Sequence, residues 1–374
     1  MFDKLAKAFA SSRKIFASSI KIHDPLKEPF ILKKDDSSSE AGTEFNNSGN
    51  VAGQGAPVNQ FTKDEFAALF EACRKGDLEV VKELLEAKPT IINETTKDGF
   101  TALHLASLKG HLEVAKELIN KKPALLNIVT KDKITALHSA CKVGHLEVVK
   151  ELLKAKPTII NETTKDGFTA LHVACSGGHL GVVKELINAK PALLYMVANS
   201  GVTALHVACL EGHLDVVNKL IENPALLNGA TKNGFTALHV ACRKGHLEVV
   251  KQLLNAKPDL LDIFAKNGAT ALHEACLGGH KDIVEFLFNE GADSKCLTKR
   301  NIFGSEVIRN RITAIFHNDP DMKELINKIT SAGEIKERDA KLKQRLNQDP
   351  KPSAGTTRAL ARAVTTKEGY QPLL

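Results

Sequence analysis

Residues 98–112 read Asp-Gly-Phe-Thr-Ala-Leu-His-Leu-Ala-Ser-Leu-Lys-Gly-His-Leu, and close copies of this stretch recur along the 374-residue chain. Within it, the four residues Thr-Ala-Leu-His occur six times, and successive copies of their histidine are separated by 34, 34, 34, 33 and 34 residues. These histidines are His104, His138, His172, His206, His239 and His273. A fixed period of this length is typical of a stacked array of repeats. The sequence therefore predicts one elongated repeat domain and not several globular ones.

One repeat, taken as residues 98–131, carries the signals of a turn and two short helices. The Asp-Gly at its start is a turn signal, because glycine adopts a positive φ without a steric cost. Thr101 is suited to cap a helix that Ala102 opens, and Gly110 separates this helix from the next. The second helix is predicted from about residue 111 to about residue 120, and the Lys-Lys-Pro that follows ends it. The predicted fold class is therefore all-α.

Helices this short are marginal in water by themselves, so burial of their Leu, Val and Ala faces requires stacking against neighbouring repeats. The repeat resembles the ankyrin repeat, whose signature is Thr-Pro-Leu-His-x-Ala at a period of about 33 residues. The resemblance covers roughly residues 62–330. It implies a solenoid of stacked helix-turn-helix units with hairpin turns, in which the signature histidine ties the turn to the helix by hydrogen bonds.

Two features depart from the ankyrin pattern. The signature proline is alanine in every copy, a residue that the first turn of a helix accepts readily. These alanines are Ala102, Ala136, Ala170, Ala204, Ala237 and Ala271. The usual Gly-Ala-Asp after the second helix occurs only at Gly291-Ala292-Asp293, and elsewhere Lys-Pro or Asn-Pro stands there. We expect a longer turn at these places, which accounts for the period of 34.

The chain divides into four predicted regions. Residues 1–34 form a basic amphipathic segment, and residues 35–61 form a flexible linker rich in Ser, Asn and Gly. The repeat domain spans residues 62–330, and a charged, mostly disordered tail follows over residues 331–374. Within the repeat domain we expect an N-terminal capping repeat, six full repeats and a degenerate C-terminal cap, over residues 62–97, 98–300 and 301–330. Asp319-Pro320 is predicted to start a helix of this last cap.

The N-terminal segment has two interpretations that the sequence leaves open. Residues 1–23 carry five basic residues and one acidic residue, with apolar residues such as Phe2, Leu5 and Phe9 at roughly helical spacing. Such a helix suits weak contact with an anionic membrane surface, or targeting. The alternative is a loosely ordered extension, or a helix packed on the first repeat. No apolar run of about 18 residues occurs, so no transmembrane helix is predicted.

Histidine and cysteine follow the repeat and not a metal site. Twelve of the 14 histidines and six of the seven cysteines occupy fixed positions of the repeat. Metal ligands need to converge on one point, whereas these residues are spread over successive layers. Layers about 8–10 Å apart also hold cysteines too far from one another for a disulfide, which requires Cα atoms within about 7 Å. We expect no metal, no cofactor, and small buried thiols suited to a reducing compartment.

The sequence argues against an enzyme and against nucleic-acid binding. It carries no glycine-rich phosphate loop, no Gly-x-Ser-x-Gly and no His-Glu-x-x-His, so we predict no catalytic residues. The net charge is +7, but residues 62–330 hold 34 basic and 32 acidic residues. That balance leaves no basic stripe for a nucleic-acid backbone.

The informative residues are those that vary between otherwise matching copies. In ankyrin proteins the hairpin tips and the first helices line a concave groove that binds other proteins, and the resemblance implies the same here. The predicted partner-binding residues are Phe100, Leu108, Lys109, Ile134, Lys142, Phe168, Val202, Leu210, Glu211, Phe235, Arg243 and Lys244. The three phenylalanines have two interpretations, either as exposed anchors for the partner or as core side chains beneath the turns.

We therefore predict a monomeric, non-enzymatic scaffold or adaptor that binds a partner protein in a concave groove. Two alternatives use other parts of the sequence. The first is a peripheral membrane tether that docks through residues 1–23. The second is an effector that an intracellular bacterium secretes into the host cytoplasm, because near-identical repeats resemble those of ankyrin proteins from such bacteria. The expected location is the cytoplasm, of the cell itself or of a host, with a membrane surface as the alternative.

Overall fold

The computed structural model of the chain describes residues 63–292 and 319–329. Within these residues the chain forms fifteen α-helices and six short 3-10 helices, and it forms no β-strand. The predicted all-α class is confirmed. The segments predicted over 1–34, 35–61 and 331–374 lie outside the described residues, as does most of 301–330.

Each repeat contributes a first and a second α-helix, in that order. The first helices are α2 (Lys63–Lys75), α4 (Ala102–Lys109), α6 (Ala136–Val143), α8 (Ala170–Gly177), α10 (Ala204–Glu211), α12 (Ala237–Lys244) and α14 (Ala271–Gly278). The second helices are α3 (Leu78–Ala87), α5 (Leu112–Lys121), α7 (Leu146–Ala155), α9 (Leu180–Ala189), α11 (Leu214–Ile221), α13 (Leu247–Ala256) and α15 (Lys281–Asn289). One further helix, α18 (Pro320–Ile329), follows them.

The helices begin and end where the local signals predict. Thr101 caps α4, because its Oγ1 accepts the backbone N–H of His104 at 3.3 Å. Gly110 ends the same helix with a φ of 79°, the left-handed conformation that glycine adopts most easily. The second helix of this repeat, α5, spans Leu112–Lys121, within one residue of the predicted bounds at each end. Both predicted helices are thus confirmed.

A 3-10 helix stands where the sequence predicted only a longer turn. These helices are η1 (Pro89–Asn93), η2 (Pro123–Asn127), η3 (Pro157–Asn161), η4 (Pro191–Tyr195), η5 (Pro224–Asn228) and η6 (Pro258–Asp262). Proline opens each one, because its fixed φ suits a helical turn and its missing N–H would have no partner there. In η2 the turn buries Leu125 and Leu126, which are 0% and 3% exposed. Each of these turns is therefore a buried helical turn, where the sequence predicted only a longer one.

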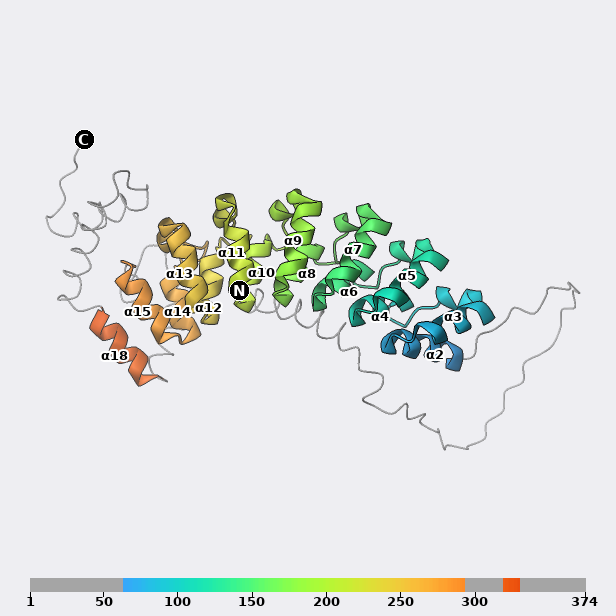
Figure 1. Ribbon diagram of the computed structural model, residues 1–374. Coiled ribbons are helices and arrows are strands. Elements are labelled where there is room, and N and C mark those ends of the chain that lie inside the picture. The colour runs from blue at the N-terminus through green and yellow to red at the C-terminus, as the bar shows by residue number, and fades with distance from the viewer. Residues whose placement is uncertain (1–62, 293–318, 330–374) are drawn as a thin grey trace, which may run out of the picture.

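The repeats stack side by side into a curved row. Figure 1 shows the first helices, from α2 to α14, along the inner side of the bend and the second helices along the outer side. First helices pack against the first helices of neighbouring repeats, and second helices pack against second helices. This arrangement is the solenoid that the repeat period predicts.

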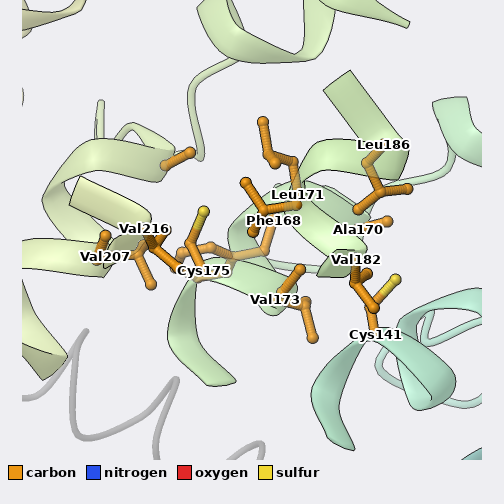
Figure 2. Close-up of a cluster of buried hydrophobic side chains, with 14 of the residues drawn as sticks. Cys141, Phe168, Ala170, Leu171, Val173, Cys175, Val182, Leu186, Val207 and Val216 are labelled. Carbon is orange, nitrogen blue, oxygen red and sulfur yellow. The ribbon is translucent and has the colours of Figure 1, made fainter. Parts of the chain in front are cut away.

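The hydrophobic core runs without interruption from layer to layer. Figure 2 shows part of it, where Cys141 of α6, Leu171 of α8 and Val207 of α10 belong to one buried cluster although they come from three consecutive repeats. A single helix pair would leave half of this surface in water, and helices of eight to ten residues do not survive alone. Each repeat is therefore stable only because its neighbours cover it.

The first described repeat departs from the pattern of the others. Phe70 and Asp77 stand where the following repeats have histidines. Asp77 instead caps α3, because its Oδ1 accepts the backbone N–H of Val80 at 3.4 Å. An atypical terminal repeat is expected in such arrays, since no further repeat stacks on one of its faces within the described residues.

The helix α18 covers part of the last described repeat. It starts at Pro320, as the Asp-Pro signal predicts, and the Oδ1 of Asp319 accepts the backbone N–H of Met322 at 3.0 Å. Its contact with α15 buries Met322 and Ile326. An ion pair of 3.0 Å joins Lys281 of α15 to Asp319, the residue that precedes α18.

Candidate functional site

A threonine–histidine pair at the start of each full repeat's first helix is a polar feature that recurs through the core. In the repeat of α6, Thr135 Oγ1 lies 2.8 Å from His138 Nδ1, and the backbone N–H of Thr135 donates to the same nitrogen at 3.3 Å. On the far side of the ring, His138 Nε2 lies 3.3 Å from the carbonyl oxygen of Phe168 in the next hairpin. The threonine contact recurs in all six copies. Each pair therefore links its own hairpin, its own helix and, in five copies with a recorded Nε2 contact, the next repeat.

The hydrogen bonds decide the protonation of these rings. A carbonyl oxygen only accepts, so Nε2 carries the proton, and Nδ1 accepts from the threonine hydroxyl and N–H. Burial lowers the histidine pKa to about 4, with the bond to the carbonyl partly opposing that shift. This holds for His104, His138, His172, His206 and His239. Both nitrogens of these neutral rings are engaged, which confirms the role in tying turn to helix that the resemblance implied.

The second set of histidines makes a contact between repeats that the sequence did not reveal. His145 Nε2 donates to the carbonyl oxygen of Leu108, in the last turn of the preceding first helix, at 3.1 Å. The ring lies directly against Gly110, where a Cβ atom would stand 2.3 Å from His145 Nδ1. The contact recurs for His111, His145, His179, His213, His246 and His280. In the sequence the only sign of this contact is the recurring Gly-His pair. The glycine of every pair but the last lies against the histidine of the next repeat, as Gly110 does against His145, and the histidine of the pair bonds to the preceding repeat, as His111 does to Arg74.

The cysteines of the first helices are small buried residues. All six, namely Cys73, Cys141, Cys175, Cys209, Cys242 and Cys276, are free thiols and are buried, which confirms the prediction for these positions. Burial raises the pKa of Cys73 to about 12 and also raises the pKa of Cys141. A thiol held in this state is a poor nucleophile. Ser107 occupies the same position in α4, and its buried hydroxyl has no hydrogen-bond partner in the described part of the chain.

No group of three or more His, Cys, Asp or Glu side chains in residues 63–292 and 319–329 is placed to hold a metal ion. Over the same residues, none of the helices has the length and apolar character needed to cross a bilayer.

The aromatic side chains at the turns belong to the core. Phe168 is 8% exposed and Phe235 is 5% exposed, so their interpretation as exposed anchors is wrong. The reason is the hairpin itself: the backbone N–H of Phe168 donates to Thr164 Oγ1 at 3.1 Å, which closes the turn with the ring beneath it. There the ring meets His172 edge-on, with 5.6 Å between the centroids. Phe100 makes the same kind of contact but is half-buried.

Three other predicted partner-binding residues are also buried. Ile134 and Val202 occupy the same turn position as Phe168 and are 3% and 2% exposed. Leu108, in the last turn of α4, is 8% exposed. Their assignment to a partner surface was wrong, because variation between repeats at these positions reflects core packing. The remaining predicted residues reach the surface: Lys109 and Lys244 are exposed, and Lys142, Leu210, Glu211 and Arg243 are half-buried.

The hairpin tips form a hydrogen-bonded row that sequence comparison alone did not single out. The backbone N–H of Lys131 donates to the carbonyl oxygen of Asp98 in the preceding tip at 2.9 Å, and Lys165 donates to Asp132 at 2.8 Å. The same bond continues to the last described tip, where Lys266 donates to Asn233 at 2.9 Å. The first tip position is an exposed lysine in five of the six hairpins: Lys97, Lys131, Lys165, Lys232 and Lys266. In the sequence these lysines can be recognised because lysine occupies the same hairpin position in five of the six repeats. The predicted partner-binding residues were instead chosen at positions that vary between repeats.

Comparison with known proteins agrees with this architecture. A family model described as ankyrin repeats (3 copies) matches the chain in overlapping stretches, over residues 52–132, 69–161, 122–193, 137–230 and 224–297. No curated protein matches the chain. The matched residues make up more than half of the sequence, and repeats of this family are protein–protein interaction modules. The chain belongs to the ankyrin-repeat family.

Proposed function

We propose that the protein is a non-enzymatic scaffold that binds a partner protein through its inner surface. We define the inner surface as the exposed and half-buried side chains of the hairpins and of the first helices. The first helices lie along the inner side of the bend in Figure 1. A concave row of this kind offers a long rigid surface to one partner, which is how repeat solenoids bind.

One observation carries the proposal: the surface positions at the ends of the first helices differ from repeat to repeat, whereas the buried Ala-Leu-His at the start of the same helices does not change. The last two residues of successive first helices provide the example, since they read Leu-Lys, Lys-Val, Ser-Gly, Leu-Glu, Arg-Lys and Leu-Gly. All but Leu108 are exposed or half-buried. Substitution there costs the fold little, so these positions are open to the demands of a partner.

The use of reactive side chains supports a non-enzymatic role. The buried histidines engage both ring nitrogens in hydrogen bonds to the fold, as His138 does with Thr135 and Phe168. The raised pKa of Cys141 leaves its thiol protonated at neutral pH. General bases and nucleophiles require side chains poised near a substrate, and these are committed to packing.

The proposed location is a reducing compartment such as the cytoplasm. Six thiols stand free in successive layers of the described array, and thiols persist in this state where the surroundings are reducing. The membrane tether depends on residues 1–34, which lie outside the described residues, and it stays a prediction together with the effector role.

Capture of partners by the full-length protein tests the proposal. The variant Lys109→Glu/Lys244→Glu changes two exposed lysines of the first helices, α4 and α12. The matched control Lys154→Glu/Lys184→Glu changes two exposed lysines of the second helices, α7 and α9. We expect cross-linking and mass spectrometry to show loss of the captured proteins in the first variant alone, with unchanged helicity by circular dichroism in both. Loss in the control alone, or in neither variant, would place the binding surface elsewhere.

A further inference from the structure

Charge is unevenly divided between the two sides of the array. The hairpins and first helices of the six full repeats, within residues 96–278, carry ten basic and five acidic residues. The second helices of the same six repeats, from α5 to α15, carry eight basic and nine acidic residues. The near-neutral charge of the whole domain therefore combines a basic inner side with a near-neutral outer side. A surface of one sign attracts partners of the opposite sign and orients them as they approach.

The tip lysines supply the most regular part of this charge. Lys97, Lys131, Lys165, Lys232 and Lys266 occupy the same position of their hairpins, and all five are exposed. The bonds between neighbouring tips hold the backbone at these positions in a continuous row, from Lys131 N–H to the carbonyl of Asp98 through to Lys266 N–H and Asn233. Asn199 takes the fourth place in the row, and its side chain donates to the carbonyl oxygen of Lys165 at 3.0 Å.

The two halves of this row differ in their own acidic residues. In the first three tips the residue after the lysine is Asp98, Asp132 or Asp166, and Lys131 Nζ lies 3.9 Å from Asp98 Oδ1. In the last three tips the same position holds Ser200, Asn233 and Asn267. The charges of Lys232 and Lys266 therefore have no carboxylate on their own tip or on the tip before it. The positive charge of the tip lysines is therefore least balanced by nearby carboxylates at the C-terminal end of the row.

A second pair of basic residues strengthens this end of the array. Arg243 and Lys244 close α12, the helix that follows the hairpin of Lys232. The guanidinium of Arg243 lies 3.6 Å from the buried carboxylate of Glu274, which partly neutralises its charge. Lys244 is exposed and adds to the positive potential around the two tips.

The spacing of the row fits an extended peptide. Packed layers of helices lie about 8–10 Å apart, and an extended chain advances about 3.3 Å per residue. Successive tip lysines therefore meet every third residue of an extended partner. A peptide with a carboxylate at every third position would pair with Lys232 and Lys266 and could continue toward the earlier tips.

The same surface is poorly suited to nucleic acid. Single-stranded nucleic acid binds on aromatic platforms set within a basic groove, but Phe168 and Phe235 are buried beneath their turns. Three of the six tips also carry an aspartate, which repels phosphate. Both observations favour spaced carboxylates as the partner chemistry.

We propose that the hairpin tips bind an extended acidic segment of a partner protein, with carboxylates at every third residue and its main anchor on Lys232 and Lys266. This inference rests on the proposed function, and it specifies the chemistry of the partner. The occupied surface is the edge of the array formed by the tips.

Fluorescence anisotropy with the full-length protein tests the inference. The probe is a labelled peptide of about 16 residues, long enough to reach along the tips, with Glu at every third position and Ser and Thr elsewhere. A second peptide has the same composition with its Glu residues in one block, and a thymidine oligonucleotide of similar length is the third probe. We expect the spaced peptide to bind more tightly than the blocked peptide, and both more tightly than the oligonucleotide, with affinity that falls as salt rises.

Two charge-reversal variants locate the site. Lys232→Glu/Lys266→Glu should weaken binding of the spaced peptide by about tenfold, because it removes two attractions and adds two repulsions at exposed positions. Lys97→Glu/Lys131→Glu, in tips that already carry an aspartate, should weaken it by about threefold or less. The outer-surface control Lys154→Glu/Lys184→Glu should bind as the unmodified protein does.

The inference is overturned if the spaced and blocked peptides bind alike, if the oligonucleotide binds most tightly, or if Lys232→Glu/Lys266→Glu binds as the unmodified protein does. The proposed function is judged separately by the capture experiment. If Lys232→Glu/Lys266→Glu retains all captured partners, this inference fails and the scaffold role stands.

Discussion

Buried polar side chains in this protein have hydrogen-bond partners for their polar atoms, and the threonine–histidine pair is the clearest case. A buried imidazole without partners would destabilise the core, but His172 accepts at Nδ1 from Thr169 at 2.8 Å and donates at Nε2 to Val202 O at 3.1 Å. The pair stabilises the fold only while the ring is neutral. A protonated Nδ1 could no longer accept from the threonine, and a charge would be left in the core.

Because these histidine rings must be neutral in the folded protein, the free energy of unfolding depends on pH. The pKa of the buried rings, such as His172, is about 4 in the folded chain against 6.5 for an ordinary histidine. Unfolded chains therefore bind protons that the folded chain excludes, so the stabilisation is complete above about pH 6.5 and is lost as pH falls toward about 4. Each such ring should cost about 1.4 kcal/mol per pH unit across this window. We expect the urea midpoint to fall steeply between pH 7 and pH 5.

The control for this prediction is the pH range above this window, from pH 7 to pH 8. Between pH 7 and pH 8 these rings are mostly neutral in both states, so their contribution should change far less than on the acid side. A midpoint that stays constant from pH 7 down to pH 5 would show that the rings titrate normally in the folded protein.

Ser107 is an exception to this pattern among the described residues. Its hydroxyl is buried without a partner, at a position where the neighbouring repeat has Cys141. We predict that Ser107→Cys raises the free energy of unfolding by about 1 kcal/mol, because a thiol loses less than a hydroxyl on leaving water. Urea denaturation measures the change. The reverse substitution, Cys141→Ser, is the matched control and should lower stability by a similar amount; a fall with Ser107→Cys would contradict the account.

At the scale of elements, the turn between the two helices of a repeat is fixed by a residue of the next repeat. Gly110 ends α4 in the left-handed conformation, and the ring of His145 occupies the space where a side chain would begin. The glycine thus serves two purposes, since it permits the backbone conformation and leaves room for the ring. The helix end and the contact between layers are a single feature.

A pair of glycine substitutions separates these effects from ordinary helix propensity. Gly110→Ala should destabilise the protein by about 1 kcal/mol or more, because of its positive φ and the contact of 2.3 Å with His145. Gly181→Ala should stabilise it by about 0.5–1 kcal/mol, since Gly181 is exposed within α9 and its added Cβ would lie 3.6 Å from Leu146. Thermal unfolding of both variants checks the prediction. Equal shifts of the two midpoints would refute it.

At the scale of the whole molecule, the array behaves as a row of interchangeable layers. Residues 87–104 and 155–172 are identical over 18 positions and lie 68 residues apart, which is two repeats. The core crosses every layer boundary through the same residue types, such as Leu103 and Leu171 at 0% exposure. A two-repeat block is therefore a natural unit of insertion or removal.

Removal of residues 105–172 tests this modularity. The junction restores the local sequence, because His104 then precedes Val173 as His172 does in the intact chain. We predict a folded, helical protein with a smaller urea m-value, since less surface is exposed on unfolding. Circular dichroism and urea denaturation measure both properties. Removal of residues 105–155, about one and a half repeats, is the control and should abolish cooperative unfolding; similar behaviour of the two deletions would refute the modular account.

The sequence by itself determined the period, the helix bounds, the caps and the layer of buried thiols. These features depend on residues within one repeat, such as Thr101 with His104 or Gly110 after α4, and six copies of the repeat make each signal unmistakable. The 3-10 helices escaped prediction because proline signals both the end of one helix and the start of another.

Only the tertiary structure decided which side chains of the hairpins and first helices reach the surface. Phe168 and Lys165 lie three residues apart in one hairpin, yet the first is buried and the second is exposed. The partner of His145 is likewise 37 residues away, in another layer. Side chains of a turn are placed by the repeat that packs against it, and the division of charge between inner and outer sides exists only once the layers are stacked. That is the physical reason why the sequence alone did not show that Phe168 and Phe235 are buried while the lysines of the tips are exposed.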